Sequence, residues 1–180
     1  LHLSRGLGDV YKRQLENIGR CIAPDLIGMG DSEKLENPGP GSYRFVEHRE
    51  YLDALLAQLG VTENVTLVVH DWGSGLGLDW ANRHRDAVKG ICYMEAIVRP
   101  VTWEEFPDPA TPVFQGFRSE NGEAMVLEKN IFVEKVLPGS VLRGLSDAEM
   151  AVYRRPFAEP GEGRRPVSYT HLRAHETSAD

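Results

Sequence analysis

A short run at residues 68–74, Val-Val-His-Asp-Trp-Gly-Ser, combines a reactive side chain with the neighbours that would expose it. Asp71 follows an apolar, β-branched run and precedes Gly73 and Gly75, so a strand can end abruptly there and turn into a helix. A carboxylate on such a turn can attack an sp3 carbon that bears a leaving group and form an ester, which water then hydrolyses. The run therefore predicts Asp71 as a nucleophile for opening carbon–halogen or epoxide bonds.

The neighbours of Asp71 exclude one class of enzyme and leave simpler interpretations open. Val69 and Asp71 stand where a Gly-x-Ser-x-Gly signature has its first glycine and its serine, which argues against a serine esterase or lipase. Trp72 has an indole N–H that can donate to a departing anion, although its ring could instead only pack in the core. Asp71 could likewise only cap the following helix. The glycines, the apolar run and Trp72 together favour the nucleophile.

The elements that must hold these residues are marked by apolar spacing. Residues 65–69 form an apolar run without alternation, as expected for a strand covered on both faces, and Gly60 stops an amphipathic helical pattern. The spacing predicts strands over residues 19–24, 65–69 and 90–94, helices over residues 42–59 and 73–85, and a turn over residues 25–32. This order predicts an α/β fold with right-handed β-α-β units, an open parallel sheet and helices on both faces.

Glu95 ends the last predicted strand, 24 positions after Asp71. The carboxyl ends of adjacent parallel strands lie along one sheet edge, where sites in such sheets form. Glu95 is therefore expected beside Asp71, although it could also be an ordinary loop carboxylate.

Composition limits the partners of the chain. The 180 residues carry a formal net charge of -7, which disfavours a nucleic acid or an anionic membrane surface and fits a small neutral substrate. Cys21 and Cys92 are far apart and outside any metal-binding spacing, so we expect buried, reduced thiols and no metal. No apolar run reaches the roughly 20 residues of a membrane helix. We expect a cytoplasmic or periplasmic protein whose native N-terminus is missing.

The composition changes after Glu95. Aromatic residues are scattered among prolines and acidic residues, at Trp103, Phe106, Phe114, Phe117 and Phe132. Residues 126–136 and 146–153 are predicted as short helices, the second beginning with the capping box Ser146-x-x-Glu149. This segment is either a helical lid over an apolar pocket or a helical extension that packs its own small core.

From residue 20 to residue 166 the sequence resembles the haloalkane dehalogenase family of the α/β-hydrolase fold. The resemblance is carried by Ala-Pro-Asp-Leu-Ile-Gly-Met-Gly-Asp-Ser at 23–32, Val-Val-His-Asp-Trp-Gly-Ser at 68–74, Tyr-Met-Glu-Ala-Ile at 93–97 and Tyr-Arg-Arg-Pro-Phe at 153–157. It implies a partial α/β-hydrolase core with a helical cap. It also implies hydrolysis of small halogenated alkanes by water to an alcohol, a halide and a proton, with no cofactor and no metal.

The resemblance also implies roles for individual residues. Asp71 matches the nucleophile, Trp72 a halide-binding donor, and Glu95 the acid that orients a histidine base, as in the subfamily whose acid is glutamate. Three residues match pocket-lining positions of the cap more loosely: Phe106, Phe114 and Phe132.

The sequence departs from the family pattern at two functional groups. The second halide donor, an asparagine in a His-Gly-Asn loop, has no counterpart, and no histidine lies in the context expected for the base. His48 and His84 fall on predicted helices, His70 precedes the nucleophile, and His171 and His175 lie in an atypical tail. The chain is therefore expected to form the ester without completing turnover.

The sequence divides into four segments. Residues 1–14 and 167–180 resemble translated adapter sequence and are excluded as non-native, although they could be genuine flexible termini. Residues 15–98 are interpreted as the partial α/β-hydrolase core and residues 99–166 as the cap. Two rivals stay open: an epoxide hydrolase, which shares the Asp-Trp pair, and a non-catalytic binding protein of the same fold.

Overall fold

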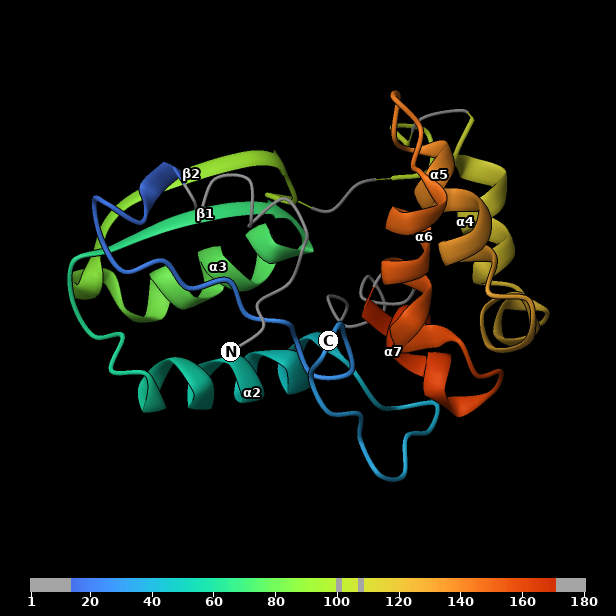
Figure 1. Ribbon diagram of the computed structural model, residues 1–180, viewed down its shortest axis with the longest axis horizontal. Helices are drawn as coiled ribbons and strands as arrows, with labels where there is room; N and C mark the ends of the chain where they lie inside the picture. The colour runs from blue at the N-terminus through green and yellow to red at the C-terminus, as the bar shows by residue number, and fades with distance from the viewer. Residues whose placement is uncertain (1–13, 100–101, 107–108, 171–180) are drawn as a thin grey trace.

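The computed structural model describes residues 14–99, 102–106 and 109–170 and has two lobes (Figure 1). The first lobe contains α2 (Phe45–Gln58), β1 (Val65–Asp71), α3 (Trp72–Arg83), a 3-10 turn (Arg85–Ala87) and β2 (Val88–Ala96). The second contains α4 (Thr111–Phe117), π-helical turns (Ala124–Glu128 and Phe132–Val136), α5 (Leu137–Gly139), α6 (Asp147–Arg154), 3-10 turns (Arg155–Phe157 and Glu162–Arg164) and α7 (Arg165–Thr170). None of the helices in these described ranges is long and apolar enough to cross a membrane.

The first lobe is a β-α-β unit. β1 and β2 pair in parallel, with Leu67 opposite Ile91 and Val69 opposite Tyr93, and α3 connects them. The predicted helix and strands at residues 65–94 are confirmed, and both strands extend beyond their predicted ends. The α/β fold class is therefore confirmed.

The strand predicted over residues 19–24 is wrong. Residues 20–26 have no regular secondary structure, and the sheet among the described residues has two strands, β1 and β2. A strand forms only where a neighbour supplies backbone hydrogen bonds, and among the described residues neither β1 nor β2 pairs with this segment. The turn that follows is as predicted: Gly28 and Gly30 have φ of 81° and 53°, and the Asp25 carboxylate accepts the Asp31 N–H at 3.1 Å.

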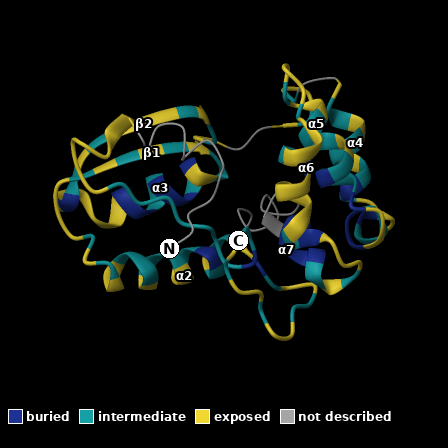
Figure 2. Cartoon of the chain, viewed as in Figure 1, coloured by how far each residue is buried: buried dark blue, intermediate teal, exposed yellow. Residues whose placement is uncertain are grey.

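Helices on both faces of the sheet are not found in the described chain. α3 covers the face that carries Val69, where a Cβ added to Gly77 would lie 2.6 Å from Val69 Cγ1. On the opposite face Val68 is 49% exposed, and exposed residues recur along both strands (Figure 2). Cys92 lies opposite Val68 and is exposed, so the buried thiol predicted there is wrong, whereas Cys21 is half-buried; both thiols are free.

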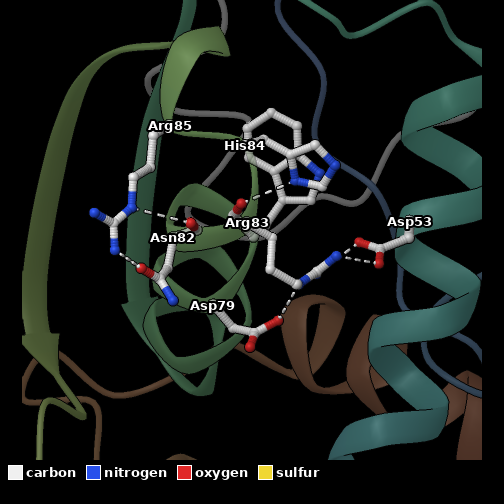
Figure 3. Close-up of polar contacts among 7 residues, drawn as sticks. Asp53, Asp79, Asn82, Arg83, His84 and Arg85 are labelled. Carbon is white, nitrogen blue, oxygen red and sulfur yellow. Dashed lines mark hydrogen bonds and ion pairs between the residues drawn. The ribbon is translucent and has the colours of Figure 1, made fainter.

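α2 is fastened to α3 by a charged cluster. The Arg83 guanidinium donates to both carboxylate oxygens of Asp53 at 2.6 and 3.0 Å and to Asp79 at 2.9 Å (Figure 3). Trp80 is 3% exposed and stacks on His84, with ring centroids 4.5 Å apart. These contacts orient α3, whose first residue follows Asp71 directly. The predicted helix 42–59 is confirmed as α2, with Gly60 at φ 67° after its end.

The second lobe has its own apolar core. Phe117, Val126, Val133 and Phe157 are at most 8% exposed and pack together with Val167. The segment after Glu95 therefore builds a small core of its own. Val167 and Ser168 are buried in α7, so this element continues past the segment boundary predicted at residue 166.

The helix predicted over residues 126–136 is interrupted. Two π-helical turns replace it, separated by Asn130, whose φ of 52° lies in the left-handed region. A residue in that conformation cannot continue a right-handed helix. The helix predicted at 146–153 is confirmed as α6 with its capping box, because Ser146 Oγ accepts the Glu149 N–H and a Glu149 carboxylate oxygen accepts the Ser146 N–H.

The charge of Glu149 is expected to stabilise α6 in a pH-dependent way. The Arg143 guanidinium, then the Ser146 N–H, lower the pKa of the Glu149 carboxyl from 4.5 to about 2. A lowered pKa in the folded state stabilises it above the unfolded-state pKa, and this contribution is lost as the pH falls toward the folded-state value. Glu149→Gln is therefore expected to lower the urea midpoint at pH 7 and to converge on the wild type near pH 2. The matched change Glu159→Gln should leave the urea midpoint unchanged. If both changes lowered the urea midpoint equally, the charge of Glu149 in the capping box would not be what stabilises α6.

The segment between residues 25 and 44 joins the two lobes. Gly28 has no room for a side chain, because an added Cβ would lie 2.6 Å from both Pro166 Cγ and Tyr43 Cε1. Tyr43 is fully buried and its hydroxyl accepts the Leu35 N–H at 2.9 Å. The motif at residues 23–32 thus holds the sheet lobe against the C-terminal part of the helical lobe.

Candidate active site

Asp71 occupies the turn between β1 and α3. Its backbone has φ 48° and ψ -129°, a conformation that is neither strand nor helix and that residues other than glycine rarely adopt. Such a conformation costs about 1–3 kcal/mol and persists only where the surrounding structure imposes it. The side chain of Asp71 makes no capping hydrogen bond to α3. Asp71 is half-buried, and its backbone is that of a sharp strand-to-helix turn rather than of a side-chain-capped helix end.

Glu95 lies beside Asp71 at the same edge of the sheet. His70 is opposite Met94 and Asp71 is opposite Ala96, so Glu95 is an extra residue in β2 at a bulge. Glu95 also has a left-handed backbone, with φ 45°. The bulge places a second carboxylate-bearing residue next to the turn that carries Asp71.

The Glu95 carboxylate contacts an imidazole. Glu95 Oε2 lies 3.1 Å from His70 Nε2, with 85% of the Glu95 side chain and 40% of the His70 side chain exposed. His70 had no predicted role, because it directly precedes Asp71, the candidate nucleophile. Strand register alone would not predict this contact, because it places Met94 rather than Glu95 opposite His70. Glu95 thus lies within hydrogen-bonding distance of an imidazole at this edge.

Trp72 is the first residue of α3 and is half-buried. Its ring packs against Phe45 of α2, with centroids 6.3 Å apart, and lies close to Gly75, where an added Cβ would be 3.4 Å from Trp72 Cε3. A glycine one turn along the helix thus leaves space for the indole. Trp72 and Asp71 are adjacent on the turn, as the sequence predicts.

The three predicted pocket phenylalanines lie in the second lobe. Phe106 contacts Phe114 with centroids 5.2 Å apart, and Phe117 joins Phe114 and Phe132 at 6.0 and 6.3 Å. Each of the three is half-buried. They pack together through Phe117, whereas Asp71, Trp72 and Glu95 lie in the first lobe.

Ser74 contacts the Asp71 turn and belongs to the predicted motif at residues 68–74, but had no predicted role of its own. It is fully buried, donates to the Asp71 carbonyl oxygen at 2.5 Å and accepts the Ile97 N–H at 2.8 Å. A serine in the first turn of a helix often bonds to a preceding carbonyl, which is the signal that could have marked it. The second bond depends on the end of β2 and has no local signal.

The other two histidines in the described ranges lie within α2 and at the C-terminal end of α3. His48 is 2% exposed in α2 beside Tyr43, with ring centroids 6.1 Å apart. His84 ends α3, where its Nδ1 lies 2.9 Å from the Trp80 carbonyl oxygen.

Residues 11–126 match the model of the alpha/beta hydrolase fold family. The chain belongs to the α/β-hydrolase fold family. In this fold the nucleophile occupies a strained strand-to-helix turn, and Asp71 stands at such a turn. A carboxylate at such a turn is chemically able to form an ester with a substrate carbon, and Trp72 and Glu95 lie next to Asp71.

Within the α/β hydrolases the chain is similar to haloalkane dehalogenases. It is 60% identical over 150 residues to a haloalkane dehalogenase of Sphingobium indicum, covering 83% of this chain and 51% of the relative. A crystal structure of a haloalkane dehalogenase from Bradyrhizobium elkani superposes with a TM-score of 0.80 at 42% identity, covering 92% of this chain and 57% of that one. The resemblance predicted from the four motifs is confirmed.

One relative has a different name. Coelenterazine h 2-monooxygenase of Renilla reniformis is 43% identical over 154 residues, covering 85% of this chain and 48% of the relative. The chain spans about half the length of the curated relatives it matches. Relatives with different enzyme names are therefore similar to this chain, and the chemistry of the Asp71 turn is needed to choose between their activities.

Proposed function

We propose that the chain carries the nucleophile of a hydrolytic haloalkane dehalogenase. An Asp71 carboxylate oxygen attacks the carbon that bears the halogen, so that a C–O ester bond forms while the carbon–halogen bond breaks and the halide leaves with the bonding pair. Water then attacks the ester carbonyl, a base takes the proton of water, and the alcohol leaves as the carboxylate is restored. The observation that carries this proposal is the strained Asp71 backbone at the junction of β1 and α3.

Trp72 and Glu95 have supporting roles in this proposal. The Trp72 indole N–H stabilises the leaving halide, which develops its charge beside the first turn of α3. Glu95 orients a histidine base in the second step, a role that is not assigned to His70. The 3.1 Å contact between Glu95 and His70 supports the capacity of Glu95 to hold an imidazole ring. The substrates are a small halogenated alkane and water.

We further propose that residues 15–98 serve as the nucleophile-bearing part of the α/β-hydrolase core and residues 99–166 as its cap. The separate apolar core around Phe117 and Val126 supports a cap that packs as its own unit. Phe106, Phe114 and Phe132 are proposed to present the edges of this aromatic cluster to an alkyl chain.

Incubating the chain with 1-bromobutane tests the first chemical step. We expect a butyl ester on the peptide that contains Asp71, detected by mass spectrometry, together with release of one bromide for each ester formed. Sustained bromide release would contradict the expectation that the chain stops at the ester. A folded chain that acquires no adduct and releases no bromide would refute the dehalogenase proposal.

The same experiment with styrene oxide separates the rivals. An adduct on Asp71 with styrene oxide but none with 1-bromobutane would favour an epoxide hydrolase. The absence of both adducts would favour a non-catalytic protein of the same fold. The 60% identity to a haloalkane dehalogenase supports the bromoalkane as the preferred reagent.

Trp72→Phe is expected to slow ester formation roughly 100-fold, because one preorganised donor to developing negative charge is worth about that much. Phenylalanine keeps an aromatic ring against Phe45 and removes only the indole N–H. The rate constant for adduct formation, followed by mass spectrometry, measures the effect. Trp80→Phe, at a buried tryptophan near the other end of α3 that stacks on His84, is the matched control and should react at the wild-type rate in the folded chain. Equal rates for the two variants would exclude Trp72 as the halide donor.

A further inference from the structure

The Ser74 hydroxyl joins the two segments that carry the proposed catalytic carboxylates. It lies in the first turn of α3, three residues after Asp71, and is fully buried. It donates to the Asp71 carbonyl oxygen at 2.5 Å and accepts the Ile97 N–H at 2.8 Å. Ile97 is the first residue after β2 and the second residue after Glu95. One side chain therefore bonds to the backbone on both sides of the site.

The strands alone do not determine the separation of these two segments. The ladder between β1 and β2 ends with Asp71 opposite Ala96, and its register slips just before that pair. Asp71 and Glu95 both have a positive φ, of 48° and 45°, which residues other than glycine rarely adopt. Such conformations relax unless other contacts hold them. The two bonds of Ser74 lie where the ladder has ended and the backbone is strained.

A purely local role explains only half of this arrangement. Serine in a first helical turn commonly bonds to a carbonyl three or four residues earlier, which accounts for the bond to Asp71. The bond from Ile97 spans 23 positions of sequence and reaches another strand. A buried hydroxyl that satisfies one donor and one acceptor in two different segments restrains both of them.

We propose that Ser74 is a positioning residue that holds the Asp71 turn at a set distance from the Glu95 bulge. The proposal rests on the dehalogenation proposed above, in which Asp71 must meet the substrate carbon in line with the leaving halide. A misplacement of about 1 Å can reduce the rate of such a step by roughly 100-fold. Ser74 touches neither the substrate nor the halide in this role.

Ser74→Ala tests the proposal because it removes the hydroxyl and leaves the Cβ in place. We expect the maximal rate constant of Asp71 esterification by 1-bromobutane to fall roughly 10- to 100-fold. The concentration of 1-bromobutane that gives the half-maximal rate should change less than about twofold, because the surface that binds 1-bromobutane keeps its shape. Ser168→Ala, at another buried serine in α7, is the matched control and should leave both constants unchanged. Rates are measured well below the unfolding transition of each variant.

Amide hydrogen exchange gives a second readout that does not depend on the reaction. Exchange at the Ile97 amide should accelerate roughly fivefold in Ser74→Ala, since about 1 kcal/mol of hydrogen bonding is lost. The Val68 amide, in the middle of β1, should exchange at the wild-type rate. Unchanged exchange at Ile97, or a wild-type maximal rate of esterification in Ser74→Ala, would overturn the positioning role. If the wild-type chain never esterifies Asp71 while Ser74→Ala still accelerates exchange at the Ile97 amide, the dehalogenation proposal alone is refuted and the positioning role of Ser74 stands.

Discussion

Asp71→Asn is expected to abolish ester formation with 1-bromobutane, lowering the rate by about four orders of magnitude or more. The amide oxygen of asparagine is a poor nucleophile, whereas its size and shape match those of the carboxylate. The strained turn at Asp71 should therefore persist while the reaction is lost. Mass spectrometry of the chain after incubation and the release of free bromide measure the effect.

Asp86→Asn is the matched control for this substitution. Asp86 is exposed in the turn that follows α3, at the end of the helix opposite to Asp71. This variant should react at the wild-type rate. Persistent esterification of Asp71→Asn at another carboxylate would show that the nucleophile is misassigned, and unchanged circular dichroism would exclude loss of the fold as the cause.

Arg164→Met is expected to destabilise the second lobe by about 3–5 kcal/mol. The Arg164 guanidinium is buried and donates to the carbonyl oxygens of Phe157, Ala158, Leu127 and Glu128 at 2.7–3.1 Å. Methionine fills a similar volume but leaves these acceptors without their donor, at about 1–3 kcal/mol for each one that stays buried. Urea denaturation followed by tryptophan fluorescence measures the loss.

Arg154→Met is the matched control for Arg164→Met. Arg154 pairs with Glu134 on the surface, with 45% and 32% of the two side chains exposed. Exposed ion pairs contribute about 1 kcal/mol or less, because water solvates both partners. The control should therefore change the urea midpoint only slightly. Similar midpoints for the two variants would indicate that the second lobe does not depend on the buried guanidinium.

The sequence predicted the β1-α3-β2 unit because its signals are local. An apolar run, a glycine-rich turn and helical spacing follow one another within residues 65–94, and the structure keeps that order. The Asp71 turn could be predicted for the same reason, since a strand and a helix without an intervening loop require a sharp turn. The Ser146 capping box is equally local and is also present.

The errors arise where structure depends on distant neighbours. Residues 19–24 have the composition of a strand, but a strand needs hydrogen-bonding partners that composition cannot specify. The exposure of Val68 and Cys92 depends on what packs over that face of the sheet, which an apolar run does not encode. Asn130 interrupts the helix predicted over 126–136; it is 4% exposed and has φ 52°, and local sequence does not encode this combination of burial and backbone conformation.

The amino-acid sequence by itself determined the identity of the nucleophile candidate, the type of element on each side of it and the family resemblance. All three are properties of contiguous residues, whose spacing and chemistry can be evaluated without a partner. Only the tertiary structure decided that Glu95 sits on a bulge against His70 and that Ser74 bonds to Ile97. These contacts join residues 23–25 positions apart, and their formation depends on strand register and burial, which are set by the packing of the whole lobe.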